Sequence, residues 1–329
     1  MTTGAPLPVG VVGVGSLGFH HARILRDVTG ARLVGVYDAD AERAASVAEE
    51  LGVRAFPTLG ALLAEIEAAV VAVTTTAHEA VALEAIEAGV DLLIEKPIAA
   101  TLEEADHILA RAKERGVRIA TGHVERFNGA IRACEPYLEE PRFLESQRLA
   151  TFGPRGTDVA VVLDLMIHDI DLVLGLAKTP VVHLDAVGVP VLTPSIDIAN
   201  ARLRFEGGAV ANITASRVSR ERMRKIRLFQ PSGYLSLDLG SGKGEFLRMR
   251  ADAASFTPGE AVPQLADIVE RVELESDGKE PLRAELEAFV AAVRGEREMV
   301  VSGDDGRRAL SVAMEIVRGI EHDFLVPRA

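Results

Sequence analysis

Hydrophobic and polar positions alternate in blocks through the first third of the chain. Short apolar runs occur at residues 9–14, 33–37, 69–73, 90–94 and 117–120. Between them apolar residues recur at i, i+3, i+4 and i+7, as in 44–51, which is the period of an amphipathic helix. Thr101-Leu102-Glu103-Glu104 has the pattern of a capping box that opens such a helix. Apolar strands that alternate with helices predict an α/β domain with a doubly wound parallel sheet over residues 1–122.

After about residue 122 the pattern changes to single-residue alternation. Between residues 201 and 205 apolar residues alternate with two arginines, as expected for a strand with one buried and one polar face. Glu206-Gly207-Gly208 then turns the chain into a second alternating strand over 209–216. Further strands are expected at 225–229 and 234–239, and helices at 286–293 and 310–320. The second part, 123–329, is therefore predicted to be an α+β domain with a largely antiparallel open sheet.

Composition places the chain among ordinary globular proteins. It has 329 residues, of which 48% are hydrophobic and 26% charged, so two domains with sizeable cores are possible. Its net charge of −13 argues against a nucleic-acid partner, because nucleic acids are bound through Lys and Arg. No signal peptide and no apolar run near the roughly 20 residues of a membrane span are found, and Cys134 is the single cysteine. A cytoplasmic protein with no membrane partner is expected.

The strongest local motif is Gly13-Val14-Gly15-Ser16-Leu17-Gly18, between the first strand and the first helix. Asp38 ends the second strand, 20 residues after Gly18. Together they predict a dinucleotide site, with the pyrophosphate at the helix N-terminus and Asp38 on the ribose hydroxyls. The expected contacts are Gly13, Gly15, Ser16, Leu17, Gly18 and Asp38. Asp38 favours NAD over NADP, because it would repel a 2′-phosphate; the alternative is a helix-capping Asp in Asp38-Ala39-Asp40.

Glu95-Lys96-Pro97 stands at the end of the apolar run 90–94. The carboxyl ends of parallel strands line the ligand crevice of such a sheet, so Lys96 is expected to face the bound cofactor as a positioned catalytic group. Pro97 is expected to fix its direction, and an X–Pro bond can do so in the cis form. Glu95 either orients Lys96 or contacts the nicotinamide side, and both alternatives stay open.

Thr74, Thr75 and His78 follow the preceding strand. They are expected to contact the nicotinamide ribose, or else one threonine caps the helix that begins near His78. His20 and His21, in the first helix, are expected to pack against the sheet or face water.

Asp164 and His168 are four residues apart and thus on one face of a predicted helix. A carboxylate there can orient the imidazole and stabilise its protonated form, which suits His168 for general-base catalysis. On spacing alone, a surface pair is the simpler interpretation. Asp169 and Asp171 crowd the same segment, and part of this charge is expected to be solvated. No metal site is expected, since no known ligand spacing supports one.

With the glycine motif, Glu95-Lys96-Pro97 and the Asp164/His168 pair in this order, the chain resembles the glucose–fructose oxidoreductase and inositol dehydrogenase family (Gfo/Idh/MocA). The resemblance covers nearly the whole chain. It implies oxidation of a sugar or cyclitol hydroxyl with NAD(P). It also implies that Lys96 touches the reacting hydroxyl and the nicotinamide, that His168 is the acid/base and that Asp164 supports it.

Two segments, 122–128 and 152–171, are similar to a narrower branch, the UDP-N-acetylglucosamine 3-dehydrogenases. This likeness implies a UDP-sugar substrate and a 3-keto product on the way to 2,3-diamino sugars of lipid A or surface polysaccharide. The chain departs from the pattern at Gly129, where a proline is usual, and at 159–162, where the wider family is Gly-rich. The substrate contacts implied here are Glu125, Arg126 and Asn128.

Basic residues cluster between 217 and 227 in an otherwise acidic chain. Arginine binds phosphate oxygens in a bidentate manner, so Arg217 and the separate Arg155 are candidates for the diphosphate. A solvated strand face or a row of subunit-interface ion pairs explains the same cluster.

Two rival functions remain at this stage. A dehydrogenase of free sugars or inositol would use the same residues, with the basic cluster purely structural. A catalytically silent dinucleotide sensor would not need Lys96, Asp164 and His168. In either case the sheet with one polar face is expected to pair with a second copy, giving a homodimer or homotetramer.

Overall fold

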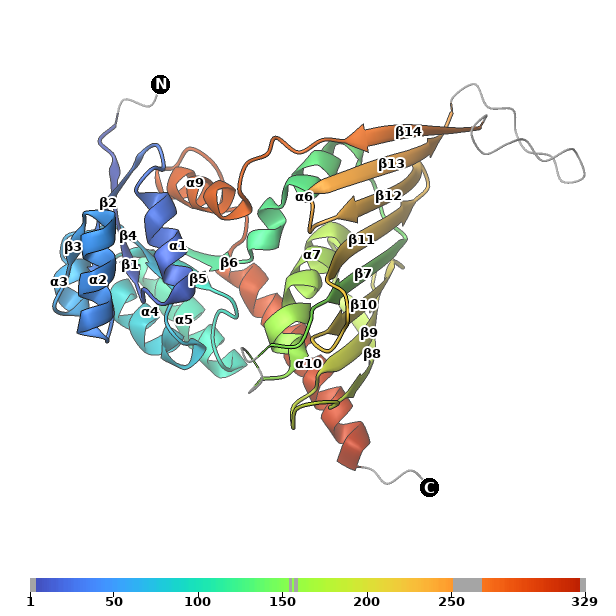
Figure 1. Ribbon diagram of the computed structural model, residues 1–329, viewed down its shortest axis with the longest axis horizontal. Helices are drawn as coiled ribbons and strands as arrows, with labels where there is room; N and C mark the ends of the chain where they lie inside the picture. The colour runs from blue at the N-terminus through green and yellow to red at the C-terminus, as the bar shows by residue number, and fades with distance from the viewer. Residues whose placement is uncertain (1–3, 154–155, 157–158, 251–267, 326–329) are drawn as a thin grey trace, which may run out of the picture. The chain divides into compact units, whose positions relative to one another are not determined.

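The computed structural model describes residues 4–153, 156, 159–250 and 268–325. The chain divides into two compact units (Figure 1). The first contains Met1–Phe127 and Glu280–Ser311, and the second Asn128–Lys279 and Val312–Ala329.

A six-stranded parallel sheet forms the centre of the first unit. Its strands are β1 (Leu7–Val12), β2 (Ala31–Tyr37), β3 (Arg54–Ala55), β4 (Ala68–Val71), β5 (Asp91–Glu95) and β6 (Ile119–Gly122). Their order is β3-β2-β1-β4-β5-β6, and every pairing is parallel. The order reverses between β1 and β4, which is the position where doubly wound sheets bind ligands. The predicted α/β fold is confirmed.

Helices cover this sheet. They are α1 (Ser16–Leu25), α2 (Ala41–Leu51), α3 (Leu59–Leu63), α4 (His78–Glu87), α5 (Leu102–Arg115) and α9 (Pro281–Val293), with the short 3₁₀ turns η1 (Thr75–Ala77) and η2 (Val124–Phe127). The predicted capping box of α5 is confirmed, because Thr101 Oγ1 accepts from the Glu104 N–H and the Glu104 carboxylate accepts from the Thr101 N–H. These caps satisfy N–H groups that the helix leaves unpaired.

Helix α9 belongs to the first unit, although it follows the second sheet in sequence. It packs against α1, and its Leu286, Phe289 and Val290 join the core that contains Val9. The single division at residue 122 predicted from the sequence therefore differs from the structure, in which residues 280–311 return to the first unit. Helical periodicity shows that α9 has an apolar face, but it carries no information about which sheet covers that face.

The second unit is built on an eight-stranded sheet. Its strands are β7 (Phe143–Leu149), β8 (Val181–Val189), β9 (Ile198–Phe205), β10 (Val210–Ser216), β11 (Met223–Gln230), β12 (Gly233–Asp238), β13 (Lys243–Met249) and β14 (Val269–Leu274). They lie in the order β14-β13-β12-β11-β7-β10-β9-β8, and only β7 and β10 pair in parallel. Ala201, Leu203 and Phe205 are buried, as the alternation predicts, and the largely antiparallel sheet is confirmed.

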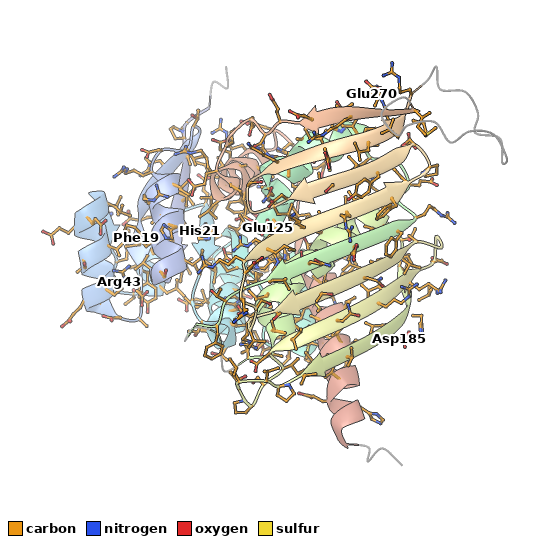
Figure 2. All side chains as sticks on the ribbon, turned by 45° about the vertical axis from the view of Figure 1, so that its right-hand side comes forward. Phe19, His21, Arg43, Glu125, Asp185 and Glu270 are labelled. Carbon is orange, nitrogen blue, oxygen red and sulfur yellow. The ribbon has the colours of Figure 1, made fainter. Side chains whose placement is uncertain are left out.

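Helices of the second unit lie on one face of its sheet. They include α6 (Gly129–Cys134), the 3₁₀ turn η3 (Glu135–Tyr137), the π-helical segment η4 (Val162–Met166) and α7 (Ile167–Ala177). Helix α10 (Gly303–Leu325) begins in the first unit and ends in the second. The opposite face of the sheet carries no helix among the described residues (Figure 2). In the part of the chain that the structure describes, no helix is both long and apolar enough to span a membrane.

Candidate active site

The glycine motif has the geometry of a dinucleotide loop. Gly13 has a φ of +83°, and a Cβ on it would lie 2.7 Å from the Val73 N atom. A Cβ on Gly18 would lie 1.8 Å from the Gly13 carbonyl oxygen, so only glycine allows the loop to pack on α1. Gly15, by contrast, has open space where a Cβ would be. The three glycines thus supply a tight turn, a close contact within the loop, and room for a ligand to approach the main chain of the loop.

The N-terminus of α1 is suited to an anion. Gly15 is its N-cap and provides no side-chain cap, and the first turn holds no acidic residue. Ser16 and Leu17, which begin the helix, are exposed. Backbone N–H groups and the helix dipole both favour a phosphate at such a position. The residues present therefore fit the pyrophosphate of a dinucleotide.

Asp38 braces this loop directly. Its Oδ2 accepts a 2.7 Å hydrogen bond from the Val14 N–H, and its Oδ1 accepts from the Asp40 N–H at 3.0 Å. The helix cap is Asp40, which accepts from two N–H groups in the first turn of α2. Arg43 completes the arrangement by donating from Nε to the Val14 carbonyl at 2.8 Å. The contact of Asp38 with the ribose stays a prediction.

The threonines after β4 do not cap a helix. Thr74 precedes η1 and makes no side-chain capping bond, and the N-cap of α4 is Ala77. The capping alternative for these threonines is therefore wrong. The predicted contacts of Thr74 and Thr75 with the nicotinamide ribose remain untested predictions.

His78 is buried, and both of its ring nitrogens lie near main-chain carbonyl oxygens. Its Nδ1 lies 3.0 Å from the Pro97 oxygen and its Nε2 lies 3.3 Å from the Val73 oxygen. Burial lowers the pKa of His78, so a neutral imidazole is favoured. A neutral imidazole carries one N–H, so His78 donates to only one of these two carbonyls, of which the Pro97 oxygen is the nearer. The predicted cofactor contact of His78 stays a prediction.

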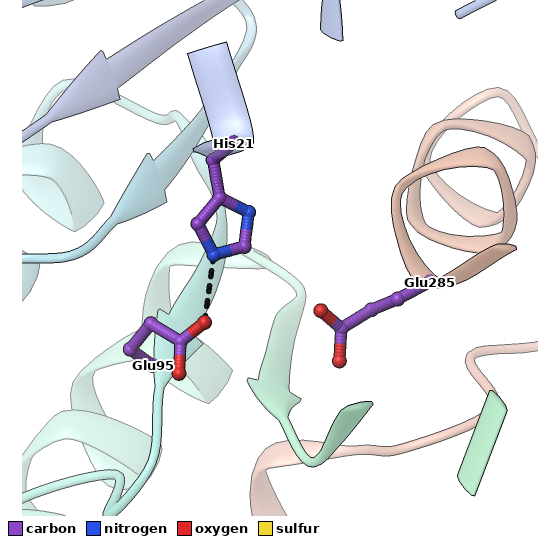
Figure 3. A group of neighbouring side chains, drawn as sticks. All are labelled: His21, Glu95 and Glu285. Carbon is purple, nitrogen blue, oxygen red and sulfur yellow. Dashed lines mark hydrogen bonds and ion pairs between the residues drawn. The ribbon is translucent and has the colours of Figure 1, made fainter. Parts of the chain in front are cut away.

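Glu95 is held by two donors at the end of β5 (Figure 3). Its Oε1 lies 2.7 Å from His21 Nε2, and its Oε2 accepts from the Lys96 N–H at 3.1 Å. Burial by itself would raise the pKa of the Glu95 carboxyl, but the hydrogen bond from His21 and the charges of His21 and Lys96 hold that pKa below its usual value. Pro97 follows Lys96 through a cis peptide bond. These contacts favour the alternative in which Glu95 orients Lys96.

Asp164 and His168 lie in the second unit, where η4 continues into α7. Both side chains are partly exposed, whereas Met166 and Ile167 between them are buried. Gly156 has a φ of +73°, and a Cβ there would lie 2.7 Å from Asp164 Oδ2, so Gly156 lies close to this carboxylate. A π-helical segment inside an α-helix is frequent at functional sites. The sequence predicted the pair but not the π-helical winding.

A buried ion pair anchors the helix that carries His168. Arg148 of β7 donates from Nε to Asp169 Oδ2 at 2.6 Å and from Nη2 to Oδ1 at 3.3 Å, and the Ser146 hydroxyl donates to Oδ1 at 2.7 Å. Asp169 and Asp171 are each 1% exposed, so the expectation that part of this charge is solvated is wrong. Sequence reasoning missed Arg148 because β7 itself was not predicted; the local signal was the polar residue two positions earlier, Ser146, on the same strand face.

The predicted substrate contacts fall in different places. Glu125 is buried and Arg126 partly exposed, both in η2 of the first unit. Asn128 caps α6 by accepting from the Ala130 N–H at 3.1 Å and donates to the Leu239 carbonyl at 2.9 Å. Arg155 lies outside the described residues. The substrate contacts of these residues stay predictions.

Arg217 has a structural set of partners. It donates to the carbonyls of Gly156, Val159 and Ile196 and pairs with Asp197. The N–H groups of its guanidinium are therefore engaged by main-chain carbonyls, and a phosphate contact would have to share these donors. Within the same basic cluster, Arg227 pairs with Glu145 on the open sheet face. Lys225 lines a hollow of about 720 Å³ that contains none of the predicted site residues.

Comparison with known proteins identifies the family. Residues 7–123 match the oxidoreductase family with an NAD-binding Rossmann fold, and residues 122–236 match the GFO/IDH/MocA C-terminal domain. The chain belongs to the GFO/IDH/MocA family. The predicted family and the prediction of an oxidoreductase are thereby confirmed.

Two of the similar proteins span nearly the whole chain, and a third spans half of it. The chain is 41% identical over 317 residues to the UDP-N-acetylglucosamine 3-dehydrogenase of Acidithiobacillus ferrooxidans, covering 95% of this chain and 96% of that one. The solved structure of a UDP-N-acetylglucosamine 3-dehydrogenase from the same organism aligns with a TM-score of 0.87 and 38% identity, covering 96% and 98%. An inositol 2-dehydrogenase of Saccharopolyspora erythraea is 36% identical over 182 residues, or 50% of this chain and 52% of its own.

Proposed function

We propose that this GFO/IDH/MocA enzyme uses NAD⁺ to oxidise the 3-hydroxyl of UDP-N-acetylglucosamine to the 3-keto sugar nucleotide. The observation that carries the proposal is the 41% identity to a UDP-N-acetylglucosamine 3-dehydrogenase over nearly the full length of both chains. The inositol dehydrogenase match, in contrast, extends over half of this chain. The geometry of the glycine loop and of the Lys96 turn agrees with dinucleotide-dependent chemistry.

The proposed roles follow from the chemistry of each side chain. The loop from Gly13 to Gly18 holds the pyrophosphate, and Asp38 accepts from the ribose hydroxyls. The bound nicotinamide supplies the acceptor for the hydride that leaves C3. Lys96 donates a hydrogen bond to the substrate O3 and stabilises the negative charge that develops on it. His168 takes the O3 proton, so that the C–O bond becomes a carbonyl, while Asp164 orients the imidazole.

The substrate assignment is tested by initial rates of NADH formation with four compounds under identical conditions. They are UDP-N-acetylglucosamine, free N-acetylglucosamine, N-acetylglucosamine 1-phosphate and myo-inositol. We expect the sugar nucleotide to have the highest kcat/KM, and reduction of the product with borodeuteride to place deuterium at C3. A higher kcat/KM for myo-inositol or the free sugar would assign the enzyme to another branch of the family. Bound NAD without any turnover would support the silent sensor.

The acid/base role is tested with His168→Asn. Loss of a general base costs about 10²–10⁴-fold in rate, so turnover should fall by that order while the dissociation constant of NAD⁺ is unchanged. His183, an exposed histidine of β8 in the same unit, provides the matched control His183→Asn. Near-wild-type turnover of His168→Asn would remove His168 from the mechanism.

The product's chemistry indicates a place in a reaction sequence. A ketone at C3 is the substrate that an aminotransferase converts to a 3-amino sugar, so we propose that the product is used for 2,3-diamino sugars of lipid A or surface polysaccharide. Adding an amino donor and a sugar-nucleotide aminotransferase to the reaction should convert the product to a 3-amino sugar nucleotide, observed by mass spectrometry. A product that is not aminated would contradict this use.

A further inference from the structure

Three ionisable side chains approach one another in the core of the first unit, near the end of β5 (Figure 3). His21 comes from α1, Glu95 from the end of β5 and Glu285 from α9; their exposed fractions are 0%, 7% and 1%. One ligand-type atom of each lies within 4.8 Å of the others. Three such groups in a protein core require specific hydrogen bonds, because burying an unsatisfied charge is costly.

The geometry between His21 and Glu95 is that of a hydrogen bond. His21 Nε2 and Glu95 Oε1 are 2.7 Å apart. Two ligands of one metal ion, each about 2.0–2.2 Å from it in a tetrahedral site, stand farther apart than this. The imidazole therefore donates to the carboxylate, in the manner of the carboxylate–histidine pairs that orient functional groups elsewhere.

The Glu95 carboxylate has little freedom to move. On the side of β6 it packs against Gly122, where a Cβ would lie 2.9 Å from the carboxylate carbon. His21 holds one of its oxygens, and the main-chain N–H of Lys96 is bonded to the other. A displacement of the imidazole would thus be transmitted to the backbone of Lys96 through one rigid carboxylate.

We propose that His21 is a positioning residue for Lys96 and acts through Glu95. Donation from His21 Nε2 keeps the carboxylate in place, and the carboxylate in turn fixes the Lys96 N–H and lies close enough to interact with its ammonium charge. Together with the bond between His78 and the Pro97 carbonyl, this anchors the turn on both sides of the lysine. The inference rests on the proposed function in so far as Lys96 contacts the reacting hydroxyl.

Two variants of similar polarity distinguish a role of the hydrogen bond to Glu95 from a role of the side-chain volume at position 21. His21→Gln retains an N–H near the position of Nε2, whereas the amide of His21→Asn is too short to reach Glu95. We expect the Asn variant to lower kcat by about 10–100-fold, as misplacement of a catalytic group by about 1 Å does, with NAD⁺ affinity retained. The Gln variant should recover most of this loss. His20→Asn, at the exposed neighbouring position, is the control and should match the wild type.

A second readout is independent of the sugar substrate. The pH dependence of Lys96 acetylation by acetic anhydride, followed by mass spectrometry of the Lys96 peptide, gives the pKa of its amine in each variant. Without the hydrogen bond from His21, the Glu95 carboxylate is no longer kept in place beside Lys96, and its attraction for the ammonium group becomes weaker. The pKa of Lys96 should therefore fall in His21→Asn and stay unchanged in His21→Gln and His20→Asn.

The outcomes are distinct. A folded His21→Asn protein that binds NAD⁺ but keeps the wild-type acetylation profile overturns the proposal, whatever the substrate is. If the Asn variant does not fold, the Gln variant decides, since a Lys96 pKa that departs from the wild-type value there also overturns it. A shifted profile in an enzyme that does not oxidise UDP-N-acetylglucosamine would contradict the proposed function and leave the role of His21 intact.

Discussion

The carboxylate of Asp38 has a structural role in the glycine loop and a proposed role in binding the cofactor. It accepts the Val14 N–H and the Asp40 N–H, so it is part of the loop's own structure, and it is also the proposed acceptor for the ribose hydroxyls. The two roles depend on different properties of the side chain. An oxygen acceptor is enough for the Val14 N–H, whereas repulsion of a 2′-phosphate requires the negative charge.

Asp38→Asn should therefore weaken the preference for NAD over NADP while its one oxygen still accepts from the Val14 N–H. Hydrogen bonds to charged groups contribute about 1.5–3 kcal/mol, so the ratio of the two dissociation constants should shift by about 10-fold or more. Titration of each dinucleotide by calorimetry measures the ratio. Asp38→Ala is the comparison, because it also leaves the Val14 N–H without its acceptor and should lower the melting temperature. An unchanged ratio in both variants would remove Asp38 from the ribose site.

The buried imidazole of His78 makes the free energy of unfolding depend on pH. Burial lowers its pKa below 6.5, so as the pH falls through 6.5 the unfolded chain takes up a proton that the folded chain resists. The free energy of unfolding should then decrease with falling pH, by at most about 1.4 kcal/mol per pH unit for this one group. His78→Gln cannot titrate and should flatten that slope in urea unfolding curves below pH 6.5. An equal slope in wild type and variant would contradict the assignment, and His20→Gln controls for loss of an exposed imidazole.

At the scale of elements, the helix that carries His168 depends on a strand. Helix α7 is attached to β7 by the Arg148–Asp169 pair, which is buried at both ends and supported by the Ser146 hydroxyl. Removing one partner of such a pair leaves an uncompensated charge in the core, whereas replacing both partners with apolar residues can be nearly neutral. The pair therefore fixes the position of α7 more than it adds net stability.

Arg148→Met should lower the free energy of unfolding by about 3–5 kcal/mol, because it leaves the buried Asp169 carboxylate without its positively charged partner. The double variant Arg148→Met/Asp169→Leu should be more stable than Arg148→Met alone, and denaturant unfolding of the four proteins in the cycle measures the coupling. Arg148→Lys retains the charge but not the bidentate geometry and should lower kcat with a smaller loss of stability. Additive effects in the cycle would show that the pair does not act as a unit.

The elements that could be predicted from the sequence are those with a local signal. The parallel strands of the first unit other than β3 contain apolar runs, and the cap of α5 lies within four residues, so both followed from the chain alone. Strand β3 has two residues, and three of the six residues of β14 are charged, so neither shows an apolar run. The return of α9 to the first unit depends on tertiary packing, which periodicity does not encode.

The candidate site divides in the same way. The turn of the glycine loop and the position of Lys96 after β5 were predictable because each belongs to a short motif at a strand end, while their roles stay predictions. The contact of His21 with Glu95 joins residues 74 positions apart, and that of Arg148 with Asp169 joins residues 21 positions apart on elements of different type. A sequence shows that such groups exist but not that they meet. This is why His21 was expected only to pack or to face water, and why Asp169 was expected to be solvated.

At the scale of the whole molecule, the helix-free face of the second sheet remains to be explained. Phe143, Phe229 and Tyr234 occupy paired positions on neighbouring strands there, with ring centroids 5.5 Å and 4.7 Å apart. All three are only partly buried in the single chain. Aromatic residues on an exposed face are characteristic of interfaces, and ion pairs such as Arg227–Glu145 surround them. These features support the proposal of a homodimer or homotetramer formed through this face.

In a two-fold symmetric dimer each substitution is present on both sides of the interface, so one charged residue at its centre acts twice. Phe229→Arg should therefore shift the protein toward monomer in size-exclusion chromatography with light scattering, and the shift should grow on dilution. The variant should retain its NAD⁺ affinity, because the glycine loop lies in the other unit. Glu50→Arg, on the exposed surface of α2, changes the charge in the same direction and should leave the oligomeric state unchanged. A wild-type protein that is monomeric at micromolar concentration, or a Phe229→Arg variant with the wild-type mass, would exclude this face as the subunit interface.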